Sequence, residues 1–104
     1  MQNYLSNIAL TAPPSISITS PEDGSKVQTE GNVTITASVT DDVRVTQVAF
    51  FVNATLLCTD TTAPYTCLWH TPGRGNATYT IQARAYDSAG NTGTSTITVE
   101  SSSN

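Results

Sequence analysis

The sequence predicts an all-β domain, folded as a sandwich of two antiparallel sheets. Apolar and polar residues alternate with a period of two in every long apolar segment between Val33 and Val99, as in strands that bury one face. Turn-forming residues recur about every 8–12 positions, which is the spacing typical of sandwich strands. Apolar residues at helical spacing are not sustained over any stretch of helix length.

We predict seven strands. The first carries Ile16 and Ile18 and ends at a strong turn signal, Pro-Glu-Asp-Gly, at residues 21–24. The predicted strands span residues 15–20, 32–40, 46–53, 55–60, 64–70, 78–87 and 94–100.

The strands after the first alternate in the same way, apart from the short 55–60 strand. The predicted inward residues are Val33, Ile35, Ala37, Val39, Val48, Phe50, Val52, Tyr65, Cys67, Trp69, Tyr79, Ile81, Ala83, Ala85, Ile97 and Val99. Burial of the large apolar side chains, at roughly 1.5–3 kcal/mol each, is the main force predicted to hold the fold. Truncation of Val48, Phe50 or Trp69 should cost most, about 2–5 kcal/mol each.

A chain of 104 residues is long enough for one domain with a modest core. Residues 14–100 form the predicted domain. Residues 1–13 are predicted to be a leader or interdomain linker, or an added edge strand, because Ile8 and Leu10 alternate with polar neighbours. Residues 101–104 are a Ser-rich tail that resembles the start of a linker.

The sequence predicts neither a membrane span nor a secretory signal. Its apolar runs are much shorter than the roughly 20 residues that cross a bilayer, and Met1 is followed by polar residues rather than a basic start and an apolar middle. We interpret the chain as a mature or excised part of a longer protein, with Met1 as a start codon for expression. A cytosolic protein is the alternative.

The charge excludes nucleic-acid binding. The net charge is −4, and the four basic residues are dispersed rather than clustered on a phosphate-binding surface. They are Lys26, Arg44, Arg74 and Arg84. Hydrophobic residues make up 38% of the chain and charged ones only 12%, which argues against disorder.

Residues 43–57 and 60–65, then Trp69, then residues 79–91 resemble bacterial immunoglobulin-like domains. The resemblance covers most of residues 14–100. Such domains repeat in tandem in secreted glycoside hydrolases, peptidases and surface adhesins. The resemblance therefore implies a seven-stranded antiparallel immunoglobulin-like β-sandwich with a spacer, stalk or carbohydrate-proximal accessory role, outside the cell or on its surface.

The sequence departs from that family at several positions. Ala54 and Cys58 stand where members commonly carry Gly, and Cys67 stands where they carry an aromatic residue. Ala37 and Ala83 occupy the places of the two inter-sheet cysteines of antibody domains, so an antibody-like or vertebrate receptor domain is disfavoured.

Cys58 and Cys67 lie on consecutive predicted strands joined by a short connection. If those strands lie side by side, their Cα atoms reach the 4.4–6.8 Å range of a disulfide, which would stabilise the fold by roughly 2–3 kcal/mol. The even count and an exported context favour the bond; two buried thiols are the alternative. With His70 the cysteines supply only three ligands, so zinc is not predicted.

Acidic loops suggest a calcium site. Asp41 and Asp42, then Asp60, then Asp87 with Asn91 fall in loops that should converge at one pole of an antiparallel sandwich. Their oxygens are the ligands that Ca²⁺ requires. The alternative is that these side chains bond nearby backbone amides in their own turns. No other cofactor is predicted.

Three glycosylation sequons begin at Asn32, Asn53 and Asn76, although a chain this rich in Ser and Thr would carry about two by chance. We predict no enzymatic activity and no catalytic residue. The chain has one histidine, His70, and no nucleophile elbow or oxyanion loop that would accompany it in a hydrolase. Its acidic residues lie in turns rather than in a glycosidase-like pair.

Three functions fit these features. The first is a non-catalytic spacer or adhesion module of a secreted or surface-anchored multidomain protein, whose partners are its neighbouring domains. The second is a carbohydrate-binding accessory module that uses exposed aromatic residues such as Tyr4, Phe51 and Tyr86. The third is a self-assembling fibre subunit, in which residues 1–13 add a strand to the open edge of a neighbouring copy.

Overall fold

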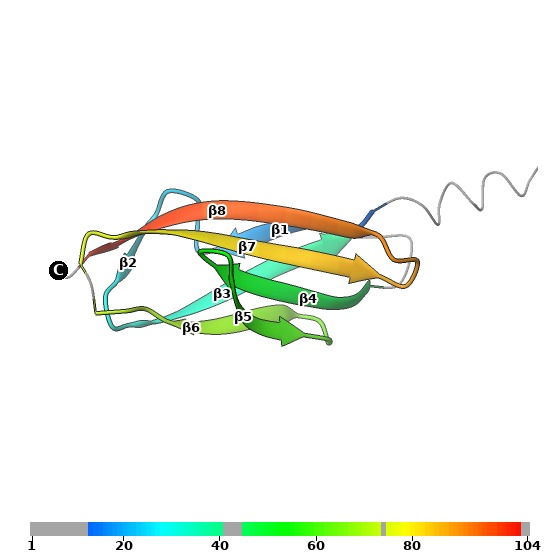
Figure 1. Cartoon of the computed structure of the whole chain (residues 1–104), viewed down its shortest axis with the longest axis horizontal. Helices are drawn as coiled ribbons and strands as arrows, with labels where there is room; N and C mark the ends of the chain where they lie inside the picture. Colours follow the sequence, from blue (N-terminus) through cyan, green and yellow to red (C-terminus); the bar gives the residue numbers. More distant parts are fainter. Residues whose placement is uncertain (1–12, 41–44, 74, 103–104) are drawn as a thin grey trace, which may run out of the picture.

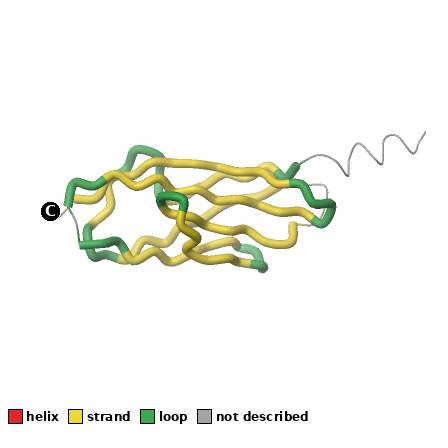
Figure 2. The backbone as a smooth tube through the Cα atoms, in the orientation of Figure 1, coloured by secondary structure: helices red, strands yellow, loops and turns green. Residues whose placement is uncertain are grey.

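The computed structural model describes residues 13–40, 45–73 and 75–102, and each regular element within them is a β-strand. This part of the chain therefore has no helix that could cross a membrane. The strands are β1 (Ser15–Ser20), β2 (Lys26–Gln28), β3 (Asn32–Thr40), β4 (Val45–Val52), β5 (Thr55–Asp60), β6 (Tyr65–His70), β7 (Thr78–Asp87) and β8 (Thr92–Ser102). One sheet has the order β1-β3-β6 and the other β2-β8-β7-β4-β5. The two layers pack face to face (Figures 1 and 2), which confirms the predicted sandwich.

The prediction of seven strands, all antiparallel, missed β2. Its three residues pair with the end of β8 in the parallel direction, and Val27 lies opposite Ser101. Three residues are too few for alternation to be recognised in a sequence. The segment becomes a strand because Val27 is buried in the core while its neighbours are exposed.

β8 is longer than the predicted strand 94–100. It begins at Thr92 and continues through Ser101 and Ser102, the first two residues of the predicted Ser-rich tail. Ser101 is buried, and its backbone N–H donates to the carbonyl of Ala77 at 2.7 Å while its hydroxyl accepts from the Ala77 N–H at 3.1 Å. These bonds extend the β7–β8 edge beyond the last apolar residue, Val99.

The core lies between the sheets and consists of the inward residues of both. Its buried members are Ile18, Val27, Ile35, Ala37, Val48, Phe50, Cys67, Trp69, Tyr79, Ile81, Ala83, Ala85, Ile97 and Val99. All but Ile18 and Val27 belong to the inward set predicted from alternation, and Ile18 was predicted as an apolar residue of the first strand. Ala49 is an exception, since it sits out of phase with that set and is still only 4% exposed. It pairs with Thr59 on β5 and Arg84 on β7, and a methyl group between two longer side chains is shielded from water.

The two open sides of the sandwich, its rims, are closed in different ways. At one rim β1 lies beside β8, and the backbone N–H of Ile18 donates to the hydroxyl of Ser95 at 3.1 Å. At the other rim β5 faces β6, and a disulfide joins them. Each rim therefore carries a tie that the hydrogen-bond ladders of the sheets do not provide.

The chain enters and leaves the sandwich at opposite poles, as Figure 1 shows for the start of β1 and the end of β8. Pro14 is buried against the start of β8, and a Cβ atom at Gly93 would collide with the Pro14 carbonyl oxygen. From Gly93 to Ser102 the chain is extended over 102 − 93 = 9 residue steps. At 3.3 Å per step, the two poles are about 30 Å apart.

Candidate functional site

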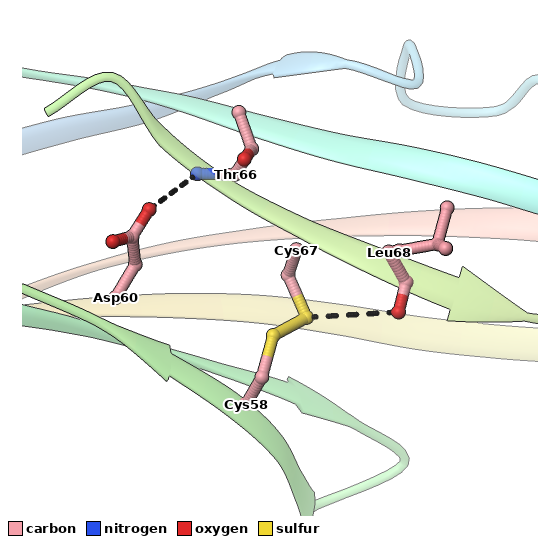
Figure 3. Close-up of a disulfide and its surroundings, with 5 residues drawn as sticks. All are labelled: Cys58, Asp60, Thr66, Cys67 and Leu68. Atoms are coloured by element: carbon pink, nitrogen blue, oxygen red, sulfur yellow. Dashed lines mark hydrogen bonds between the residues drawn. A yellow bond between two sulfur atoms is a disulfide. The ribbon is translucent and has the colours of Figure 1, made fainter. Parts of the chain in front are cut away.

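Cys58 of β5 and Cys67 of β6 form a disulfide, which is the predicted pairing. Their Cα atoms are 6.3 Å apart, within the range that a disulfide spans. The setting differs from the predicted one, because β5 and β6 do not lie side by side in one sheet; they belong to different sheets. The bond therefore ties sheet to sheet at one rim (Figure 3), with Cys67 buried and Cys58 half-buried.

The carboxylate of Asp60 holds the connection between β5 and β6 next to this disulfide. Its Oδ1 accepts the backbone N–H of Thr62, and its Oδ2 accepts that of Thr66, both at 3.1 Å. Figure 3 shows the second bond reaching from the end of β5 to the start of β6. Both oxygens thus serve the turn, as the alternative to a calcium site predicted.

The carboxylate of Asp87 holds the β7–β8 turn in the same way. It is buried, and its Oδ1 accepts the backbone N–H groups of Ala89 at 2.9 Å and Asn91 at 2.8 Å. Asp41 and Asp42 lie outside the described residues. Within the residues described, no group of three or more His, Cys, Asp or Glu side chains is arranged to hold a metal. The calcium site at this pole stays a prediction.

A contact that the sequence did not reveal runs along the outer edge of β8. Residues 23–29, from the turn before β2 to the residue after it, lie against residues 98–102; we call this contact the β8 clasp. It begins where Asp23 Oδ1 accepts the backbone N–H of Thr98 at 2.8 Å, while the Gly24 N–H donates to the Thr98 carbonyl at 2.7 Å.

The clasp continues through β2 to the end of the strand pair. The Glu100 N–H donates to the Ser25 carbonyl at 3.0 Å, the parallel ladder follows, and the Thr29 N–H donates to the Ser102 carbonyl at 3.1 Å. The sequence signal was the Asp-Gly pair at residues 23–24, which predicted a turn but not the strand edge to which that turn is bound.

Thr71 fixes the other end of β2. Its side chain is 0% exposed, and its hydroxyl donates to the Gln28 carbonyl at 2.6 Å and accepts the Gly31 N–H at 2.7 Å. The Thr71 N–H in turn donates to the Gly31 carbonyl at 2.9 Å. The β2–β3 turn is thereby attached to the residue after β6. Nothing in the sequence distinguishes this threonine from the many that face solvent.

Phe51 and Tyr86, the two described members of the aromatic set predicted to bind sugar, do not form a row. Phe51 and Tyr86 are half-buried, and Phe51 lies opposite Gln82, four residues from Tyr86 along β7. The two rings are therefore about 13 Å apart along the sheet. The Arg84 guanidinium lies 5.2 Å from the centroid of the Phe51 ring and occupies one of its faces. Tyr4 lies outside the described residues.

His70 and the three sequons lie at the surface. The His70 Nδ1 is 3.2 Å from the Asn32 side-chain oxygen. The Asn53 side-chain oxygen accepts the Thr80 N–H at 2.9 Å. Asn32, Asn53 and Asn76 are all exposed, and glycosylation of them stays a prediction.

The sequence of this sandwich is similar to a known domain family. The model of the bacterial Ig domain matches residues 14–99. The chain belongs to the bacterial Ig domain family. This bacterial Ig domain has no significant match among curated proteins.

Solved structures give the same fold. This bacterial Ig domain is similar to fibronectin(III)-like modules of Clostridium thermocellum CbhA, with 30% identity and a TM-score of 0.79 over 86% of this chain and 98% of that one. It is similar to part of a modular endo-β-1,4-mannanase from Cellulomonas fimi, with 26% identity and a TM-score of 0.58 over 88% of this chain and 19% of that one.

A third similar structure supports the fold alone. The endo-β-1,4-mannanase from Thermotoga petrophila is 14% identical, with a TM-score of 0.70 over 90% of this chain and 21% of that one. The bacterial Ig domain thus spans almost the whole length of the CbhA module but only about a fifth of each mannanase chain.

Proposed function

We propose that this bacterial Ig domain is a non-catalytic module that spaces the neighbouring domains of a secreted or surface-anchored multidomain protein. The observation that carries the proposal is the placement of Pro14 and Ser102 at opposite poles of an extended sandwich (Figure 1). A domain attached before Pro14 and another attached after Ser102 would be held about 30 Å apart, the length of nine extended residues.

A spacer of defined length must be rigid, and several contacts support rigidity here. The disulfide and the bond from Ile18 to Ser95 tie the sheets together at both rims. The contact of Pro14 with Gly93 fixes the chain where it enters the sandwich, and the β8 clasp fixes it near where it leaves. At each pole the terminal strand is therefore held by a contact in addition to its main ladder, which is β1–β3 at one pole and β7–β8 at the other.

The comparisons support neighbouring domains as the partners. In two endo-β-1,4-mannanases the matched part is about a fifth of the chain, so the same fold accompanies a much larger remainder there. Secretion or surface display is part of this proposal, and the inter-sheet disulfide supports it because such bonds persist in oxidising compartments.

A distance measurement tests the spacer. Spin labels carried by non-natural amino acids at Ser15 and Glu100, both exposed, leave the native disulfide intact. We expect one narrow distance distribution that matches the length of the sandwich. A broad or two-peaked distribution would contradict a rigid spacer.

A binding assay separates the carbohydrate-binding alternative. The chain is incubated with insoluble mannan and cellulose and then sedimented, with Phe51→Ala as the matched variant. We expect the wild-type protein to stay in solution. Retention on either glycan that Phe51→Ala abolishes would establish a carbohydrate-binding module instead.

A further inference from the structure

We propose that the module bears tensile load and that the β8 clasp is the contact that resists it. The inference rests on the proposed function, because load reaches the module only through neighbouring domains. Pull from those domains would act at Pro14 and Ser102, which lie at opposite poles, so the force would run along the strands rather than across them.

The first and last strands run in the same direction, so tension drives them apart lengthwise. Pro14 adjoins Gly93, and Ile18 bonds Ser95 four residues further along β1 and two further along β8. Tension would draw β1 back toward the pole where both strands begin and draw β8 toward the opposite pole. The ladder bonds of both strands lie across this direction. They are loaded in shear and must break together.

Of the two terminal strands that tension would pull, β1 is held more weakly than β8. It has six residues, pairs only with β3, and its register shifts at a bulge between Ile18 and Ser20. A bulge leaves residues unpaired. When β1 slips, the load passes through residues 21–22 to Asp23, where the clasp begins.

The clasp is placed to take that load. Because β2 is parallel to β8 and pairs with its last residues, its leading end at Lys26 is pulled toward one pole while Ser102 is pulled toward the other. The bonds from Asp23 to Thr98 and from Thr29 to Ser102 are strained at the same time. The Asp23 bond has a carboxylate acceptor, which makes it one of the stronger hydrogen bonds in this set.

The opposite rim is off the path of the force. Asp60 also accepts backbone N–H groups through an accessible carboxylate, but it joins β5 to β6, and neither strand is at a chain end. Asp23 and Asp60 thus serve as a test position and its matched control. Each holds a loop through carboxylate hydrogen bonds, and only Asp23 lies in the line of tension.

Single-molecule constant-force measurements test the proposal, with handles at the two ends of the full chain. We expect Asp23→Ala to shorten the lifetime of the folded module under load about tenfold. The reason is that the unfolding barrier loses the contribution of one hydrogen bond to a charged group. Asp60→Ala should change that lifetime by less than about twofold, because forced unfolding reports the unfolding rate along the pulled path. Equilibrium denaturation of both variants shows whether each one folds.

The outcomes are distinguishable. Equal shortening in Asp23→Ala and Asp60→Ala, or no shortening in Asp23→Ala, would overturn the clasp as the load-bearing contact. If Asp23→Ala does not fold, Val27→Ala loosens the packing of β2 without altering its ladder and should shorten the lifetime likewise. A rigid distance between Ser15 and Glu100 combined with a clasp that has no effect on lifetime would leave the spacer standing and reject the load-bearing role.

Discussion

The indole ring of Trp69 meets the phenol ring of Tyr79 edge-on across the two sheets, with centroids 5.2 Å apart and ring planes at 73°. Trp69 comes from β6 and Tyr79 from β7, so the contact joins strands of opposite layers. Such pairs contribute about 0.5–1.5 kcal/mol beyond the area that they bury. Thr71, whose hydroxyl bonds the β2–β3 turn, follows Trp69 by two residues.

Trp69→Ala should lower the free energy of unfolding by about 3–5 kcal/mol, because it opens a cavity between the sheets. Denaturant unfolding measures the change. Leu68→Ala is the matched control at the next position, where the side chain is 64% exposed, and should stay within about 0.5 kcal/mol. In the unaltered protein the Trp69 fluorescence should be that of a buried indole; emission typical of water would contradict the predicted core.

Replacing both cysteines, as in C58A/C67A, should lower the free energy of unfolding by about 2–3 kcal/mol, because the bond restricts a short loop in the unfolded chain. Urea unfolding with and without a dithiol reductant checks this for the wild-type protein. The double variant controls for other effects of the reductant and should not respond to it. A wild-type midpoint unaffected by full reduction would show that the bond adds no stability.

Ala54→Gly should raise the free energy of unfolding by about 1 kcal/mol. Ala54 has a φ of 69°, in the left-handed region, where a Cβ atom costs roughly 1–2 kcal/mol and glycine has no such cost. Thermal unfolding measures the shift. Ala89→Gly is the control, since Ala89 is not among the residues with positive φ and glycine there should not stabilise. A stabilised Ala89→Gly would point to a general effect of glycine instead.

Gly93→Ala should destabilise the fold by about 1–3 kcal/mol, because the new methyl group would overlap the backbone of Pro14. Gly73→Ala is the comparison, since its methyl group would meet the Glu30 side chain, which can move aside. Limited proteolysis near Pro14 adds a local measurement. Faster cleavage there in Gly93→Ala alone is expected, and equal cleavage in both variants would argue against close packing at this pole.

Calcium should leave the melting temperature unchanged, because the carboxylates of Asp60 and Asp87 already accept backbone N–H groups in their own turns. A thermal melt with excess calcium is compared with one in chelator. A rise in melting temperature that Asp87→Asn removes would instead establish the predicted ion site.

The parts of the fold that depend on alternation were predictable. Long strands such as β3 and β7 bury every second side chain, so their inward residues follow from the period alone. The partner of Cys58 was also predictable, because the chain has only one other cysteine. Whether the bond joined neighbours in one sheet or two different sheets was not, since that depends on where the chain crosses between layers.

The parts that depend on single polar atoms were not predictable. Asp23, Thr71 and Ser101 act through hydrogen bonds to backbone groups that are distant in sequence. Their local sequence resembles ordinary turn and surface residues, and only the assembled sandwich brings a carbonyl or an N–H group within reach. β2 is a strand for the same reason, because the edge of β8 supplies the partner that three residues cannot specify.

The irregular borders of the sheets have a consequence for a protein with many such modules in a row. Copies on one polypeptide are at high local concentration, where long, straight, unprotected borders invite neighbours to exchange strands or to aggregate. Here β1 and β5 each meet their partner through a bulge, and β2 is only three residues long. These interruptions make the borders at β1, β2 and β5 poor templates for a foreign strand, which would help repeated copies to fold independently beside one another.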